Sequence, residues 1–349
     1  MMLPCCNSRQ IEAGTWSPRR GEAIGLTALD FRGVPASLEW SSPLRADSQC
    51  ASVRPSEWEW TPFGCESHGA SSTLHSMCAA MTGGILVVGD SISEQLALVL
   101  AAMLHSGANS AWKDGTSSDT CRQVQGPCHS VRVCNGSSTL GLVRADHLAG
   151  APVWRSLAFV HSFQTVVVNT GSHAPERAAE RSLRVLRQLV RDVLLPNQTL
   201  VWWDTPLGHP DCEITLGRGP VASVGEAMSR LWARDQRSPL PYNWSSLISA
   251  NSAVRDELDA HRSRALFLPF ATMAVQRHDA HRGRVSRQRI KLRDAVPVDG
   301  AESVDTASAS SANPGAVDCV HWCVPGPLEE AVRWLFRLLQ CPRPGLRRN

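Results

Sequence analysis

The sequence predicts an α/β fold in which a parallel β-sheet lies between two layers of helices. Short runs of aliphatic and β-branched residues alternate along the chain with longer stretches that have apolar residues at helical spacing. This alternation is typical of βαβ units. The chain has 349 residues, of which 43% are hydrophobic, so it can bury a sizeable core in one large domain or two smaller ones.

The segment 84–103 is the unit around which the rest of the chain is organised. An uninterrupted apolar run over 84–88 predicts a buried strand, and apolar residues recur at helical spacing between 96 and 103. Gly-Asp-Ser at 89–91 forms the turn between them, which places Ser91 at the carboxyl edge of the sheet, beside the free N–H groups of a helix start. Those donors suit a developing oxyanion. The alternative is that Asp90 or Ser91 only caps the helix.

After this unit, the rest of the chain alternates between expected strands and helices. Further strands are expected at 139–143, 165–168, 200–203 and 264–268, and helices at 175–195, 244–261 and 328–339. We expect a catalytic domain over 57–340, whose start at 58–65 is a tryptophan-rich lead-in that packs against the sheet.

Four segments lack this periodicity. Residues 1–56 mix Cys, Pro, Ser and Arg and are expected to be irregular or partly disordered, and 106–137 reads as a loop held by disulfides. Residues 284–316 are expected to form a disordered insertion, and 341–349 a basic tail. Because that tail lacks aromatic partners and the net charge is only +3, nucleic-acid binding is not favoured.

Twelve cysteines and three sequons, at Asn135, Asn197 and Asn243, indicate an oxidising secretory compartment and a disulfide framework. The first ten residues do not resemble a signal peptide, and no run of eighteen apolar residues occurs. We therefore expect that a membrane anchor is missing from the start of this sequence. The alternative is that the sequons and cysteines mislead.

A nucleophilic serine needs a histidine base and an acid that orients the histidine. Asp318 and His321 are three residues apart, so on a helical turn they would share a face. They follow Ser91 by more than two hundred residues, and an α/β sheet with a central first strand would bring them to it. Alternatively, His321 is a buried structural histidine, or Cys319, His321 and Cys323 bind zinc together with His278 and His281. Disulfides are favoured over zinc, and no metal site is expected.

Four short blocks carry a resemblance to a known family. They are Trp60-x-Pro62-x-x-Cys65, Val88-Gly89-Asp90-Ser91, Asn169-Thr170-Gly171 and Asp318-Cys319-x-His321-Trp322-Cys323-x-Pro325-Gly326. Together they resemble the PC-esterase group of the SGNH hydrolase superfamily, which includes the plant trichome-birefringence-like polysaccharide O-acetyltransferases and fungal capsule O-acetylation proteins. The resemblance spans residues 58–340 and implies an SGNH-like, flavodoxin-like three-layer sheet.

The resemblance also implies roles for individual residues. Ser91 would be the nucleophile, His321 the base and Asp318 its orienting acid. Gly89, the backbone of Ser91 and Asn169 would form the oxyanion hole. The plant pattern continues Asn-Thr-Gly-His, whereas here Ser172 precedes His173, which puts a role for His173 in doubt. Less constant loop motifs make Gly171, His209, Arg277 and Asp279 candidates for substrate binding.

These observations lead to the hypothesis of an O-acyltransferase in the Golgi lumen. An acetyl group would pass from acetyl-CoA or another carrier, as a co-substrate and not a bound cofactor, through a Ser91 acyl-enzyme to a hydroxyl of a polysaccharide or glycan. An esterase with the same triad is the first alternative. A catalytically silent glycan-binding module is the second.

Overall fold

The computed structural model describes the chain in segments. These are residues 6–19, 57–65, 74–104, 113–114, 121, 124, 127–173, 177–209, 212, 219–235, 244–261, 264–284, 317–324 and 326–341. Outside them lie residues 285–316 of the insertion expected at 284–316, residues 342–349 of the tail expected at 341–349, and residues 1–5 and 20–56 of the N-terminal segment.

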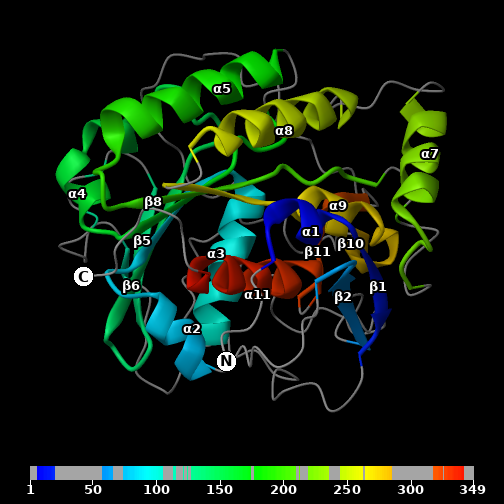
Figure 1. The fold of residues 1–349 in the computed structure, drawn as a ribbon, viewed down its shortest axis with the longest axis horizontal. Helices are drawn as coiled ribbons and strands as arrows, with labels where there is room; N and C mark the ends of the chain where they lie inside the picture. The colour runs from blue at the N-terminus through cyan, green and yellow to red at the C-terminus, as the bar shows by residue number, and fades with distance from the viewer. Residues whose placement is uncertain are drawn as a thin grey trace, which may run out of the picture.

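The described chain is a mixed α/β fold built on a seven-stranded sheet with the strand order β4-β5-β6-β3-β7-β8-β9 (Figure 1). The strands are β3 (Ile85–Gly89), β4 (Lys113–Asp114), β5 (Cys128–Val133), β6 (Ser138–Arg144), β7 (Thr165–Val168), β8 (Thr199–Trp203) and β9 (Ala265–Leu268). From β6 to β9 all neighbours are parallel, and β4 and β5 add an antiparallel edge. The expectation of an α/β fold with a mostly parallel sheet is confirmed.

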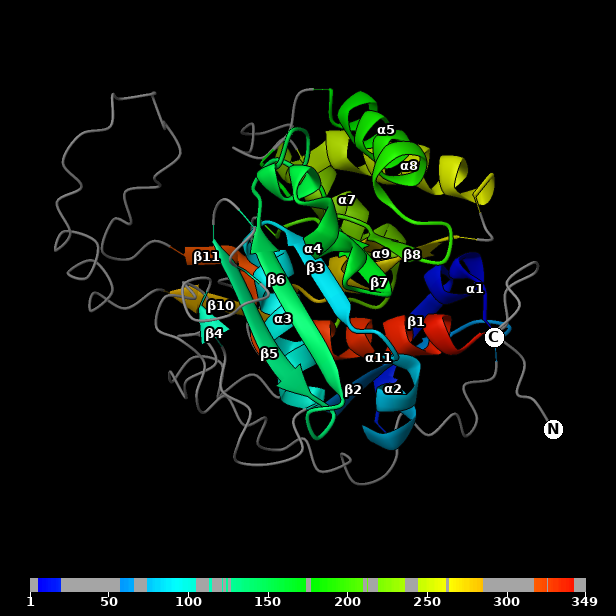
Figure 2. The ribbon, with the colours of Figure 1, turned by 90° about the vertical axis from the view of Figure 1, so that its left-hand side faces the viewer.

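Helices pack on both faces of this sheet. Alternate residues of β3 point to opposite faces, with Ile85 and Val87 in one apolar cluster and Leu86 and Val88 in another. The first cluster contains α2 (Leu74–Ala80), α3 (Ser91–Leu104), α9 (Phe270–Val275) and α11 (Pro327–Gln340). The second contains α4 (Leu157–His161), α5 (Ala178–Gln188) and α8 (Trp244–Asp259). Figure 2 shows the two groups of helices on either side of the strands.

Smaller elements complete the described chain. A π-helical turn (Leu189–Val193) continues α5, and α7 (Val224–Asp235) packs beside the start of α8 in a third apolar cluster. Short 3-10 turns span Pro152–Arg155 and His278–Ala280. Two antiparallel pairs stand apart from the main sheet: β1 (Gly14–Pro18) with β2 (Trp58–Pro62), and β10 (His281–Arg284) with β11 (Val317–Trp322).

The expectation of an irregular N-terminal segment is wrong for residues 8–18. They form α1 (Ser8–Glu12) and β1, and Trp16 of β1 packs edge-on against Trp60 of β2 with ring centroids 5.7 Å apart. The indole N–H of Trp16 donates to the carbonyl of Met273 at 2.8 Å. Its partner strand, β2, begins 40 residues after β1 ends, and β1 itself has only five residues. The local sequence therefore has no periodic pattern from which the pairing could be predicted.

The expectation of a loop over 106–137 is wrong for Cys128–Val133. This segment is β5, paired residue for residue with β6 in antiparallel register. His129, Ser130 and Arg132 interrupt its apolar pattern, so the strand depends on pairing with β6 more than on its own sequence. The disulfide part of the expectation holds, because Cys121 is bonded to Cys128.

Several disulfides cross-link the described chain. The described pairs are Cys6–Cys65, Cys78–Cys134, Cys121–Cys128 and Cys212–Cys319, and Cys323 and Cys341 are also disulfide-bonded. Such a framework fits a secretory or extracellular protein. Among the described helices, none has the length and apolar character needed to cross a bilayer.

Candidate active site

Ser91 is the first residue of α3, and only Asp90 separates it from the central strand β3. Asp90 caps the helix: its Oδ1 accepts the N–H of Ile92 at 3.1 Å, and its carbonyl accepts the N–H of Glu94 at 3.0 Å. Asp90 therefore takes the capping role, and the hydroxyl of Ser91 is free to point elsewhere.

The structure brings Ser91, His321 and Asp318 into one hydrogen-bonded chain. The Ser91 hydroxyl donates to His321 Nε2 at 2.8 Å, and His321 Nδ1 donates to both carboxylate oxygens of Asp318, each at 3.0 Å. The exposed fraction is 4% for Ser91 and 8% for His321. The geometry is that of a serine nucleophile with an oriented histidine base.

The local structure around Asp318 differs from the sequence-based argument. Asp318 and His321 lie in strand β11, not on a helical turn. The register between β10 and β11 shifts between His281 and Gly283. This bulge lets Asp318 Oδ1 also accept the main-chain N–H groups of Val320 and His321, at 3.2 and 3.0 Å. The turn of the chain around its own carboxylate brings the two side chains together.

The main-chain N–H of Ser91 is a donor available for an oxyanion. It has no hydrogen-bond partner among the described residues, and it lies at the positive end of the 14-residue helix α3. A negative oxygen next to the Ser91 hydroxyl would meet this N–H.

The other two residues expected at the oxyanion hole have contacts within the protein. Asn169 is fully buried, and its side-chain amide donates to the carbonyl of Trp203 at 3.0 Å and to the hydroxyl of Thr205 at 3.3 Å. Gly89 is the last residue of β3, and its carbonyl accepts the N–H of Ala145 at 2.7 Å. A β-carbon on Gly89 would lie 2.1 Å from the hydroxyl of Ser93, so close packing by itself requires glycine here.

Gly171 lies beside the serine turn. Its φ is +71°, and a β-carbon there would come within 2.4 Å of Asp90 Oδ2. The same carboxylate oxygen accepts the N–H of Ser172 at 3.1 Å. Through Asp90, the loop after β7 is thus joined to the turn that carries Ser91.

His209, Arg277 and Asp279, the other candidates for substrate binding, are all buried. Arg277 binds Asp279 through two hydrogen bonds of 2.8 and 3.1 Å, and its guanidinium lies over the ring of Trp16, 4.6 Å from the centroid. His209 Nε2 donates to the carbonyl of Val275 at 2.9 Å. The three side chains are nearly inaccessible and hold the loops around β10 and β11 together.

Burial also shifts the pKa values of His209 and of His281, the first residue of β10. Removal from water lowers the pKa of His281 to about 3 and holds the pKa of His209 well below its usual value.

Within the described chain, no three His, Cys, Asp or Glu residues are arranged to hold a metal ion. Cys319 and Cys323, the cysteines of the zinc alternative, are both disulfide-bonded.

Two residues at the site were not singled out from the sequence. Gln95, one turn after Ser91 on α3, binds the main chain of Trp322. Arg144, at the end of β6, binds Glu94 of α3 at 3.1 Å and Asp146 at 2.7 Å. No separate signal in the sequence marked Gln95, since it follows Ser93 and Glu94 in the polar first turn of the helix.

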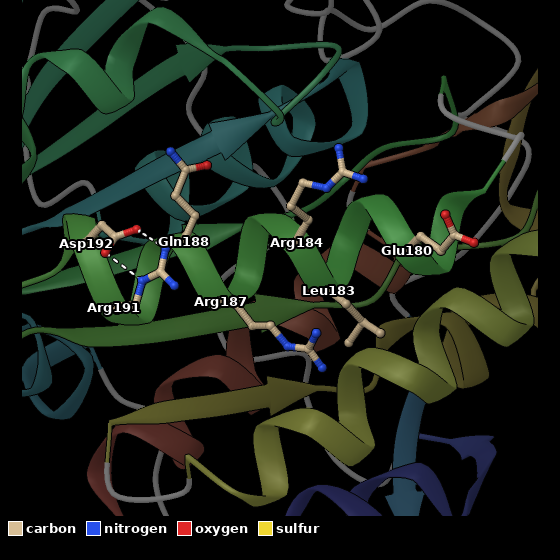
Figure 3. A pocket seen from close by; sticks show the side chains of 7 residues that line it. All are labelled: Glu180, Leu183, Arg184, Arg187, Gln188, Arg191 and Asp192. Atoms are coloured by element: carbon tan, nitrogen blue, oxygen red, sulfur yellow. Dashed lines mark hydrogen bonds and ion pairs between the residues drawn. The ribbon is translucent and has the colours of Figure 1, made fainter.

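A hollow of about 660 Å³ lies on the outer surface of α5 (Figure 3). It is lined by Glu180, Leu183, Arg184, Arg187, Gln188, Arg191 and Asp192. Its ion pairs, Arg191 with Asp192 and Arg187 with Glu257, are exposed. It contains no residue of the triad, and α5 covers the opposite face of the sheet from α3.

Comparison with known proteins adds no family assignment. No family model matches the chain, and no curated protein is significantly similar to it. We therefore infer the function from the site itself and from the motif resemblance.

Proposed function

We propose that this protein is an O-acyltransferase that moves an acetyl group through a Ser91 acyl-enzyme to a hydroxyl of a polysaccharide or glycan. The observation that carries the proposal is the hydrogen-bonded chain from Ser91 through His321 to Asp318. Helices on both faces of the mostly parallel sheet are compatible with an SGNH-like three-layer fold.

In the first half-reaction, His321 takes the proton of Ser91 as its oxygen attacks the acetyl carbonyl of the donor. Asp318 stabilises the imidazolium that forms. The carbonyl oxygen becomes negative beside the N–H of Ser91, and the donor's leaving group departs with the proton from His321. The product is an acetyl ester on Ser91.

In the second half-reaction, His321 takes the proton of an acceptor hydroxyl, and the acceptor oxygen attacks the Ser91 ester. The tetrahedral intermediate collapses, and His321 returns the proton to Ser91. The donor, acetyl-CoA or another acetyl carrier, is a co-substrate in this scheme. The triad needs no resident cofactor.

Transfer and hydrolysis would use the same triad and differ in whether a sugar hydroxyl or water reaches the Ser91 ester, since the 4% exposure of Ser91 limits the access of both. An esterase with the same residues is the second candidate, and the complete triad argues against a silent glycan-binding module. The disulfides support a secretory location, and we place the reaction in the Golgi lumen.

The test is the fate of the acyl group. Purified protein is loaded with an activated acetyl ester, and release of acetate is followed with and without a panel of oligosaccharides. Acetylated sugar formed faster than acetate supports the transferase. Release to water at the same rate whether or not sugar is present would make the protein an esterase.

A further inference from the structure

The bulge in β11 carries the acid and the base of the triad. His281 pairs with Trp322, and Gly283 pairs with Asp318, so residues 319–321 face the single residue between His281 and Gly283. Bulged residues lack regular ladder bonds, and other contacts must fix their backbone. The position of His321 therefore depends on what holds this bulge from behind.

His281 holds the C-terminal side of the bulge. Its Nδ1 donates to the main-chain carbonyl of His321 at 3.0 Å, and its ring stacks on Trp322 with centroids 4.0 Å apart and planes 28° apart. His281 is fully buried. Because a carbonyl oxygen only accepts, His281 donates from Nδ1 in this contact.

The loop after β8 holds the N-terminal side. Cys212 forms a disulfide with Cys319, the residue that follows Asp318, and the main-chain N–H of His209 donates to the carbonyl of Cys319 at 3.1 Å. The ring of His209 contacts that of His281, with centroids 4.7 Å apart. The two anchors thus belong to one buried group.

We propose that His281 and the Cys212–Cys319 disulfide are positioning groups for the triad. They fix the two sides of the bulge, so that His321 Nε2 stays within hydrogen-bond distance of Ser91. The proposal rests on the proposed function of Ser91. A misplacement of about 1 Å can cost on the order of 100-fold in rate.

The test compares His281→Leu with His281→Asn. Asparagine keeps an N–H donor close to the place of the imidazole Nδ1, whereas leucine removes it. We expect kcat of His281→Leu to fall on the order of 100-fold with KM unchanged, and His281→Asn to recover most of the loss. His161→Leu is the matched control, since His161 Nε2 also binds a main-chain carbonyl, that of Val193 at 2.8 Å, on the other face of the sheet.

The disulfide is tested by a double variant. Cys212→Ser with Cys319→Ser should lower kcat while the thermal transition stays cooperative. Cys121→Ser with Cys128→Ser, which removes a disulfide on β5, should leave kcat close to wild type. Equal losses in the two double variants would show a general stability effect and overturn the proposal for the disulfide.

A proton NMR signal separates this proposal from the proposed function. The Nδ1–H of His321, bonded to Asp318, should give a far-downfield resonance in wild type and His281→Asn and lose it in His281→Leu. A wild type that shows the resonance but forms no acyl-enzyme would refute the proposed function alone. A His281→Leu variant that keeps the resonance would overturn the positioning role.

A second inference concerns two of the sequons. Asn135 lies in the turn before β6 and Asn197 in the turn before β8, and both side chains are exposed. Both turns are therefore at the amino ends of parallel strands, whereas Ser91 follows the carboxyl end of β3. The sequon at Asn243 lies outside the described residues.

The geometry points to N-linked glycans on Asn135 and Asn197 that leave the Ser91 edge of the sheet uncovered. The full chain is expressed with an added signal sequence that directs it into a eukaryotic secretory pathway. Its glycans are released by a glycosidase in heavy-oxygen water, and peptide mass spectrometry then shows which asparagine positions carry the oxygen label. We expect both asparagines to be labelled and Asn135→Gln with Asn197→Gln to keep the wild-type acyl-transfer or Ser91-labelling rate. Secreted protein in which one or both of these positions are unlabelled would overturn the inference.

Discussion

Gln95 and Trp322 bind each other through two hydrogen bonds across 227 residues of sequence. The main-chain N–H of Trp322 donates to Gln95 Oε1 at 3.1 Å, and Gln95 Nε2 donates to the carbonyl of Trp322 at 3.2 Å. Gln95 lies one turn after Ser91, and Trp322 follows His321. One side chain therefore sets the separation between the helix that carries Ser91 and the strand that carries His321.

Replacing Gln95 by Leu should weaken both stability and activity. It leaves two buried main-chain groups of Trp322 without partners, at a cost of about 1–3 kcal/mol each before relaxation. We expect a lower denaturation midpoint in urea and a larger fractional loss in kcat than in KM. In acid, where the new carboxyl group is protonated, Gln95→Glu keeps an acceptor for the Trp322 N–H and a donor for the Trp322 carbonyl, so it should lose less stability than Gln95→Leu; an equal or larger loss there would count against this account of the contact.

Asp318→Asn should leave the fold intact and slow the reaction by about 10⁴-fold, by analogy with serine proteases. The remaining amide oxygen can still accept the N–H groups of Val320 and His321, but the amide nitrogen faces His321 Nδ1 and favours the wrong tautomer. Acyl-enzyme formation in single-turnover experiments measures the effect. A loss below tenfold would contradict the orienting role.

Gly171→Ala should destabilise the protein. Its φ of +71° is unfavourable for alanine, and the new methyl group would lie 2.4 Å from Asp90 Oδ2. We expect a loss of more than about 1 kcal/mol in the free energy of unfolding. Gly150→Ala is the control, because Gly150 has a φ of +74° but no atom within 4 Å of the added group. Equal losses would show that the contact with Asp90 does not matter.

Acid should destabilise the fold through His281. Its pKa is about 3 in the folded protein, against 6.5 as the ordinary value, so the folded state binds fewer protons. Its contribution is complete above pH 6.5 and is lost as the pH falls towards 3, by up to about 1.4 kcal/mol per pH unit.

The melting temperature of wild type should therefore fall more steeply between pH 6 and 4 than that of His281→Asn. Buried Asp204, whose pKa is raised well above its ordinary value, acts in the opposite direction, but it is present in both proteins and cancels in the comparison. Parallel curves for the two proteins would contradict the burial argument.

The sequence predicted elements whose signals are local. The strand, turn and helix around Ser91 have uninterrupted apolar and helical patterns, and the structure has β3 and α3 there. The resemblance of the block at 318–326 to a family predicted the contact between Asp318 and His321. The separate argument from helical spacing was wrong, because the segment is a bulged strand.

Features that depend on distant partners were not predictable. Strand β1 exists because β2 pairs with it across at least 40 residues of sequence. The contact of Gln95 with Trp322 and that of His281 with His321 require the complete fold. Sequence patterns record a residue's neighbours along the chain, whereas these contacts join residues that are 40 or more positions apart.

The central claim is that Ser91 carries the acyl group. The most direct measurement is intact-mass spectrometry of the protein after incubation with an activated acetyl ester, followed by peptide mapping, with Ser91→Ala as the control. The account predicts a single added acetyl group, located on Ser91 and absent from a Ser91→Ala variant that unfolds at the wild-type midpoint. Acetylation that persists in Ser91→Ala, or that maps to another residue, would contradict it.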